Sequence, residues 1–261
     1  KTAIKCGIKT ALHESNSLPG VSVKMLAPKA DLVMLGTEDA KKHLGECKKC
    51  VVTGNPLRNN IPIEEKSAAR KRLGLPDCLT ILSAGGSQGA SRLNEAVVQL
   101  LAYEQKKGNI NHIHGYGKHG RDTFMQSLED NGVDAGNPHF IIKEYIDNMY
   151  TCMCASDLII TRAGAMTLTE ITAIGRASVL IPYPYAAENH QYYNALTLQN
   201  ANAGRIIDDK ELTGSVLIDT VNRLADDPEL LRLMSENAAK LSKRDAAGII
   251  LREITELMGI K

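Results

Sequence analysis

Short runs of β-branched and other apolar residues alternate along most of the chain with segments whose apolar residues recur every three or four positions. The short runs are typical of buried strands, and the wider spacing is typical of amphipathic helices. Strands and helices that alternate in this way form βαβ units, in which parallel strands are covered on both faces. The pattern therefore predicts an α/β protein with Rossmann-like, doubly wound parallel sheets.

The first predicted unit is small. Residues 54–58 (GNPLR) interrupt regular structure because glycine and proline occur together, and we place a domain boundary there. Residues 1–57 are predicted to contain strands at 9–12, 31–35 and 49–53 and helices at 21–26 and 38–44.

The second unit, residues 58–225, is predicted to be a complete Rossmann-like domain of about six strands. Its first helix carries Leu93, Val97 and Leu101 on one face. Further helices are expected near 121–131, 167–174, 191–200 and 212–225, and strands at 79–84, 110–114, 139–142, 158–161, 178–181 and 204–207. Residues 226–261 are predicted to be helical, at 229–241 and 246–258, and to pack back across the domains.

Charge and composition exclude several classes of protein. The 261 residues carry 31 basic and 30 acidic side chains, so no overall field attracts nucleic acid or an anionic membrane. No apolar run approaches the ~20 residues of a membrane-spanning helix. Six scattered cysteines indicate free thiols in a reducing cytosol. Cys47 and Cys50 have the spacing of a zinc or redox pair, but no second ligand pair matches them, which favours an incidental pair.

The segment 156–194 carries the clearest chemical signal. A strand at 157–160 runs into the turn 161–165 (TRAGA) and then into a helix, whose N-terminus presents free N–H groups to an anion. Thr167 and Glu170 share one face of this helix and can contact a phosphate and the hydroxyls of a ribose. The same pair is also typical of an ordinary capping box.

Four segments occur together in a specific order: residues 13–20 (HESNSLPG), 52–58 (VTGNPLR), 85–90 (GGSQGA) and 162–170 (RAGAMTLTE). Together they resemble glycosyltransferase family 28, and within it the bacterial cell-wall transferases that add N-acetylglucosamine to lipid-linked muramyl-pentapeptide. The resemblance implies a GT-B fold, two Rossmann-like domains facing a cleft. It also implies an inverting transfer from UDP-N-acetylglucosamine to the muramyl 4-hydroxyl of lipid I, giving lipid II for peptidoglycan, cell shape and division.

The resemblance further implies that residues 1–57 are the end of the acceptor-side domain and that residues 58–225 bind the donor. About a hundred residues would precede Lys1, judged by the usual size of a domain. They would carry a first glycine-rich loop, a histidine, the catalytic base and an apolar patch that docks on the cytoplasmic face of the bacterial membrane. UDP-N-acetylglucosamine is then a substrate. No cofactor, metal or nucleic acid is expected, and the chain has no Asp-x-Asp motif.

The family's phosphate contacts match two turns of this sequence. Ser87 would offer its hydroxyl to the donor diphosphate, and the neighbouring glycines would let the backbone approach it, although a plain glycine turn is the alternative. Glu170 would bind the ribose diol, and the main chain of Ile146 would read the uracil edge. The remaining matches are Gly85, Gly86 and Gly89 in the first turn and Gly164, Ala165, Met166 and Thr167 in the second.

Other matches concern the sugar. Asn16 would reach the donor sugar from the opposite domain, Arg58 would face the cleft at the hinge, and Gln191 keeps an amide that the family uses for the sugar. His190 replaces a second glutamine, and it can donate to the sugar or a phosphate or simply face solvent. His13 and the adjacent glutamate can be read as base and acid, or as a structural pair.

Two other functions remain open from the sequence. The chain can belong to another GT-B enzyme, such as a UDP-N-acetylglucosamine 2-epimerase or a glycolipid galactosyltransferase, or to a silent nucleotide-binding subunit. All of the nucleotide readings require that the turns at Ser87 and Thr167 converge on one pyrophosphate.

Overall fold

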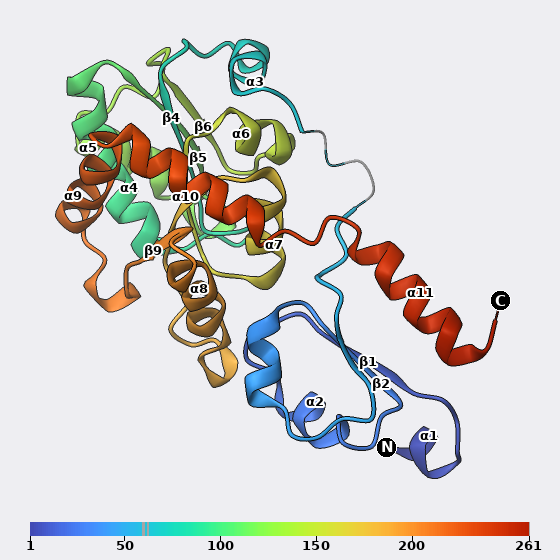
Figure 1. Ribbon diagram of the computed structural model, residues 1–261. Helices are drawn as coiled ribbons and strands as arrows, with labels where there is room; N and C mark the ends of the chain where they lie inside the picture. The colour runs from blue at the N-terminus through green and yellow to red at the C-terminus, as the bar shows by residue number, and fades with distance from the viewer. Residues whose placement is uncertain (59–60, 62, 261) are drawn as a thin grey trace.

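The computed structural model describes residues 1–58, 61 and 63–260. The first unit is a three-stranded parallel sheet in the order β1-β2-β3. It is coloured blue in Figure 1. Ala27, Val33 and Leu35 form the centre of its small core. Its elements are α1 (Thr2–Lys5), β1 (Ala11–Glu14), α2 (Val21–Leu26), β2 (Leu32–Leu35), the 3-10 helix η1 (Glu38–His43) and β3 (Cys50–Val52).

The second unit is a six-stranded sheet in the order β6-β5-β4-β7-β8-β9, and every neighbouring pair is parallel. All six predicted strands are present, each within about one residue of its expected position. The strands are β4 (Leu79–Ala84), β5 (Ile110–Gly115), β6 (Phe140–Lys143), β7 (Leu158–Thr161), β8 (Ala177–Leu180) and β9 (Gly204–Ile206).

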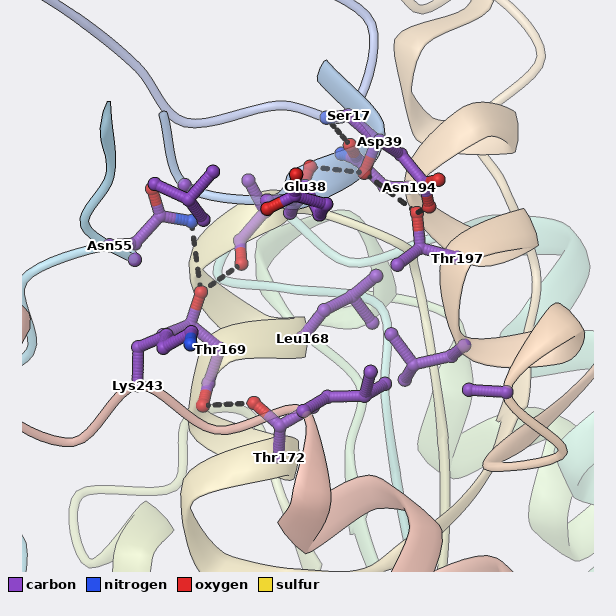
Figure 2. A pocket seen from close by; sticks show the side chains of 18 of the residues that line it. Ser17, Glu38, Asp39, Asn55, Leu168, Thr169, Thr172, Asn194, Thr197 and Lys243 are labelled. Carbon is purple, nitrogen blue, oxygen red and sulfur yellow. Dashed lines mark hydrogen bonds between the residues drawn. The ribbon is translucent and has the colours of Figure 1, made fainter. Parts of the chain in front are cut away.

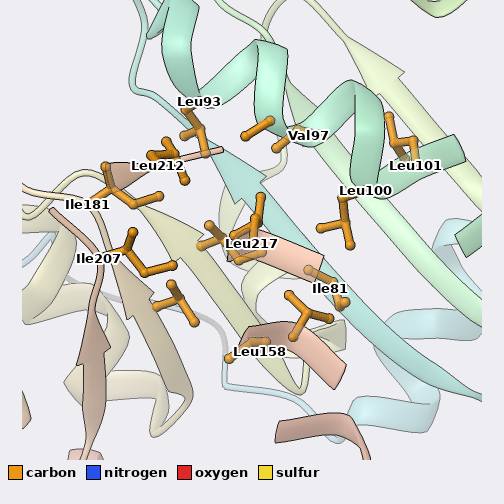
Figure 3. Packing of buried hydrophobic residues seen from close by; sticks show 14 of the residues in the cluster. Ile81, Leu93, Val97, Leu100, Leu101, Leu158, Ile181, Ile207, Leu212 and Leu217 are labelled. Atoms are coloured by element: carbon orange, nitrogen blue, oxygen red, sulfur yellow. The ribbon is translucent and has the colours of Figure 1, made fainter. Parts of the chain in front are cut away.

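Helices cover both faces of this sheet, because the apolar side chains of β4 point to both faces. Ile81 packs into one core and the next residue, Leu82, packs into the other, because successive side chains of a strand point to opposite faces. Figure 3 shows the first core, where Leu93 and Val97 of one helix and Leu217 of another lie against the sheet. This face is covered by α4 (Ser91–Lys107), α5 (Phe124–Asp130) and α9 (Gly214–Ala225), and the other by α3 (Lys66–Leu73), α6 (Met149–Ala155), α7 (Ala165–Ile174) and α8 (His190–Asn200).

The strand order reverses between β4 and β7. From β4 the chain passes through α4 to β5 on one side, and from β7 it passes through α7 to β8 on the other. The loops that follow β4 and β7 therefore diverge from two adjacent strands at the same edge of the sheet. In open α/β sheets this reversal creates a crevice where ligands bind.

Some predictions were wrong in detail. Residues 38–44 form a 3-10 helix rather than an α-helix, and β1 begins two residues later than expected. Two helices of the second unit, α3 and α6, were not predicted. The segment of α6 is apolar and mostly buried, so it shows no helical period, and the segment of α3 is dominated by basic residues. Short 3-10 helices also lie at Lys118–Gly120, Ala187–Asn189 and Asp209–Glu211.

The last two helices connect the units. Helix α10 (Pro228–Lys240) packs on α7 and β8, and α11 (Ala246–Met258) reaches the three-stranded unit. There Lys49 Nζ lies 2.7 Å from Glu253 Oε2 of α11. Within the described residues, none of the helices combines the length and apolarity needed to cross a bilayer.

Candidate functional site

A cavity of about 470 Å³ opens at the carboxyl ends of β4 and β5. Five of the sequence-predicted residues line it: Arg58, Gly86, Ser87, Ile146 and Glu170. They come from the connection between the units, the loop after β4, the segment before α6, and α7. The structure therefore brings the first predicted phosphate turn, the predicted uracil reader and the predicted ribose ligand to one cavity.

The two junctions start at paired residues. Ala84, the last residue of β4, is the partner of Thr161, the last residue of β7. The loop that contains Ser87 and the turn that leads into the helix of Thr167 thus leave the same edge of the sheet from neighbouring strands. Two turns that face one pyrophosphate would have to start in this way, although Thr167 is not among the described residues that line the cavity of about 470 Å³.

The glycines of the first loop have different structural roles. A Cβ atom on Gly89 would lie 2.3 Å from the carbonyl oxygen of Tyr116, and one on Gly85 would lie 2.6 Å from Ala90. Both glycines are thus needed by the packing of the loop on its neighbours. A Cβ on Gly86 would meet nothing within 4 Å, and Gly86 lines the cavity. Of the three, Gly86 is the one placed for a ligand to approach.

The second junction excludes the capping-box alternative. Helix α7 starts at Ala165, with Gly164 as its N-cap residue and no side-chain cap. Thr167 is therefore the third residue of the helix, whereas a capping box requires the threonine at the N-cap. Glu170 lies on the second turn of the helix. The first N–H groups of α7 have no side-chain cap and can meet an anion.

Glu170 lies in a mixed environment. Its side chain is half-buried, and its Oε1 accepts a 2.9 Å hydrogen bond from the hydroxyl of Tyr150. Burial raises the pKa of the Glu170 carboxyl, while the bond from Tyr150 and the charge of Arg58 act in the opposite direction. The carboxyl thus accepts a hydrogen bond from Tyr150 and lies in the field of a cation at the wall of the cavity.

Asn16 is held by contacts across the two units. The side-chain amide of Asn194, on α8, donates to Asn16 Oδ1 and to the carbonyl of Ala163, at 3.1 Å each. Asn194 Oδ1 in turn accepts from the backbone N–H of Ser17 at 2.8 Å. Sequence reasoning missed Asn194, although its place three residues after Gln191 puts the two on one helix face.

A second cavity of about 480 Å³ lies between the units beside this contact. Figure 2 shows it, with Thr197 hydrogen-bonded to Ser17 and to Asp39 and with Asn55 bonded to Thr169. Of the predicted donor residues, Ala165 lines this cavity.

The remaining predicted residues take supporting positions. Gln191 Oε1 accepts from the N–H groups of Ala163 and Tyr183, at 3.2 and 2.9 Å, which ties α8 to the second junction. His190 Nδ1 lies 2.9 Å from the carbonyl oxygen of Ala187 one turn earlier. Met166 is 42% exposed at the start of α7.

His13 and Glu14 have structural partners. His13 Nε2 lies 3.1 Å from the carbonyl oxygen of Gly54. The buried carboxylate of Glu14 accepts from the backbone N–H groups of Asn16 and Gly20, at 2.9 Å each. These contacts favour the structural reading of the pair.

Possible metal ligands are sparse. In the described parts of the chain, no three His, Cys, Asp or Glu side chains are grouped so as to hold a metal ion. Cys47 and Cys50 are free thiols, and desolvation raises the pKa of Cys50.

Comparison with known proteins decides the family. The model of the glycosyltransferase family 28 C-terminal domain matches residues 80–249, which include both glycine-bearing junctions. The chain belongs to glycosyltransferase family 28. Family 28 thus accounts for the whole six-stranded sheet except the first residue of β4.

Full-length relatives extend the match across the chain. A UDP-N-acetylglucosamine–N-acetylmuramyl-(pentapeptide) pyrophosphoryl-undecaprenol N-acetylglucosamine transferase of Desulforamulus reducens is 36% identical over 258 residues, which are 98% of this chain and 69% of the relative. The corresponding transferase of a Thermoanaerobacter species is 39% identical and covers 96% of this chain and 68% of the relative.

Solved structures confirm the predicted GT-B-type fold. MurG of Acinetobacter baumannii superimposes with a TM-score of 0.78 at 27% identity, over 97% of this chain and 68% of that one. The UDP-GlcNAc 2-epimerase of Neisseria meningitidis gives a TM-score of 0.65 at 15% identity, over 97% of this chain and 71% of that one, and shows the fold alone.

Proposed function

We propose that this family 28 chain holds the donor half of an inverting transferase that moves N-acetylglucosamine from UDP-N-acetylglucosamine to the muramyl 4-hydroxyl of lipid I, giving lipid II. The observation that supports it most is the pairing of Ala84 with Thr161, which starts both junctions at one sheet edge. Ser87 and Glu170 then reach the same cavity. The relatives are named as transferases that use this donor, which agrees with the proposal.

The reaction needs positive potential where the leaving group forms. When the anomeric bond breaks, negative charge grows on the diphosphate while the sugar becomes oxocarbenium-like. Donors already fixed at that position stabilise the transition state most. In the proposal, Ser87 and the first N–H groups of α7 supply these donors, Glu170 holds the ribose, and the main chain of Ile146 reads the uracil.

The chain spans about two thirds of the length of the relatives that it matches. We propose that the region before Lys1 supplies the lipid I site, the catalytic base and the contact with the cytoplasmic face of the membrane. The protein would then act in the bacterial cytoplasm as a peripheral membrane enzyme. Asn16, held by Asn194, would contact the sugar from this side.

Calorimetric titration of UDP tests the donor site. We expect Glu170→Ala to weaken UDP binding about 10-fold or more, because a charge-assisted hydrogen bond contributes about 1.5–3 kcal/mol. Thr167→Ala should weaken binding by a smaller factor. Thr220→Ala is the matched control, since the Thr220 hydroxyl donates to the carbonyl oxygen of Val216 one turn earlier in α9. Equal binding by all four proteins would contradict the proposed site.

Product analysis of the full-length protein separates the alternatives. The proposed transferase releases UDP only when lipid I is present. A 2-epimerase would convert UDP-N-acetylglucosamine without an acceptor, and a silent subunit would bind the nucleotide and turn nothing over.

A further inference from the structure

Tyr150 is a second polar group at the ribose end of the cavity. It lies on α6, whereas Glu170 lies on α7, and both line the cavity of about 470 Å³. The Tyr150 hydroxyl donates to Glu170 Oε1 at 2.9 Å. Burial and the adjacent carboxylate raise the pKa of the Tyr150 phenol, so the phenol keeps its proton and donates at neutral pH.

The bond gives the two oxygens of the Glu170 carboxylate different roles. Oε1 is engaged by Tyr150, which leaves Oε2 as the oxygen whose lone pairs a ligand can use most freely. A free glutamate side chain can adopt many rotamers, and the bond to a rigid tyrosine reduces that freedom before a ligand arrives.

The other titratable side chains among the described residues of the cavity wall are those of Arg58, Glu144, Tyr145 and Asp147. Arg58 lies on its wall and favours the ionised form of Glu170. Glu144, Tyr145 and Asp147 also line the cavity, and Glu144 is paired with Arg121 at 2.6 Å. Of these described side chains, Tyr150 is the one that donates a hydrogen bond to Glu170.

We infer that Tyr150 is a positioning residue that orients the Glu170 carboxylate toward the two hydroxyls of a ribose, and that it strengthens the preference for ribonucleotides over 2′-deoxyribonucleotides. This inference rests on the proposed donor site. It adds to that site a residue from α6 and a role in selecting the sugar of the nucleotide.

The test measures binding of UDP and of 2′-deoxy-UDP to the protein and to Tyr150→Phe. We expect UDP affinity to fall about 3- to 10-fold, in line with the loss of one hydrogen bond, and 2′-deoxy-UDP affinity to fall less. The preference for UDP therefore decreases. Tyr103→Phe is the matched control, because it removes the hydrogen bonds of 3.1 and 2.9 Å between its phenol on α4 and Asn222 on α9 and should change neither affinity.

A pH series separates positioning from mere packing. The bond from Tyr150 lowers the pKa of Glu170, so its removal should make the carboxyl protonate at higher pH. As pH falls, Tyr150→Phe should therefore lose UDP affinity at a higher pH than the unsubstituted protein. Superimposable pH profiles would overturn the inference.

A double-mutant cycle completes the design. In a Glu170→Gln background, Tyr150→Phe should have a clearly smaller effect on UDP affinity, because the carboxylate that it positions is gone. If Tyr150→Phe leaves the UDP preference intact while Glu170→Gln weakens binding, the inference fails and the donor site stands. If the unsubstituted protein does not bind UDP, both fail.

Discussion

The Gly89→Ala variant is expected to lose about 3 kcal/mol or more of its free energy of unfolding, and UDP binding with it. Gly89 has φ of 85°, a region that costs residues with a Cβ atom about 1–2 kcal/mol. The added Cβ would also lie 2.3 Å from the carbonyl oxygen of Tyr116. The backbones at Gly89 and Tyr116 cannot move apart easily, because the segment that precedes Gly89 and the segment that follows Tyr116 are bonded together. The N–H groups of Lys118 and His119 donate to the carbonyl oxygens of Ser87 and Gln88.

Gly86→Ala is the matched control for this prediction. Gly86 has φ of 87°, close to that of Gly89, but a Cβ there would meet nothing within 4 Å. Its substitution should therefore cost only the conformational part, about 1–2 kcal/mol. Chemical denaturation of the two variants gives the comparison. Equal losses would mean that the contact with Tyr116 does not constrain the loop.

Much of the second unit could be predicted because its signals are local. The run at Leu79–Ala84 is long, apolar and followed by glycines, and the apolar residues of α4 recur four positions apart, so both were placed correctly. Helix α6 could not be found in this way. Five of its seven residues are buried, and a helix buried on most sides carries no amphipathic period.

The candidate site was predicted in its turns but not in its supporting contacts. Ser87 and Glu170 follow from motifs that each occupy a few consecutive residues. Tyr150 bonds to a residue 20 positions away, and Asn194 bonds to Asn16 across 178 positions. Such contacts depend on how helices and units pack, and a local pattern does not contain that information.

A chain of buried polar side chains inside the second unit was equally hidden. Glu104 of α4 contacts His112 Nδ1 at 2.7 Å, and His112 Nε2 contacts Ser83 Oγ at 2.7 Å. Ser83 Oγ also lies 2.7 Å from His114 Nδ1. All four residues are at most 1% exposed, so the chain is a structural element of the core and no substrate can reach it. His112 and His114 lie two positions apart on β5, so their side chains point to the same face of the sheet. The pairing of β4 with β5 places Ser83 beside them.

Glu104→Ala is expected to cost about 1–3 kcal/mol of stability, because it leaves Nδ1 of the buried His112 without its hydrogen-bond partner. Glu95→Ala on the same helix is the control and should change stability by less than about 0.5 kcal/mol, since Glu95 is exposed. Urea denaturation at neutral pH measures both. A loss at Glu104 no larger than at Glu95 would show that the buried pair contributes no net stability.

The pH dependence of stability follows from His114, the last side chain of this hydrogen-bonded series. Burial, together with the neighbouring His112, holds the pKa of His114 well below its usual range. In the unfolded chain His114 takes up a proton below about pH 6.5, and in the folded protein it does not, so acid favours unfolding. This contribution is complete above about pH 6.5 and is lost as pH falls, by about 1.4 kcal/mol per pH unit until the folded pKa is reached.

His114→Phe should remove this slope, while the lost contact with Ser83 lowers its stability by an amount that does not vary with pH. The difference between the unsubstituted protein and the variant is therefore expected to shrink steadily from pH 6.5 to pH 5 in urea denaturation. Asp31 does not interfere, because a hydrogen bond from Lys48 lowers its pKa to about 2 and confines its effect to below about pH 4. Parallel stability curves for the two proteins would mean that His114 is protonated equally in the folded and unfolded states, and that the core tolerates its charge.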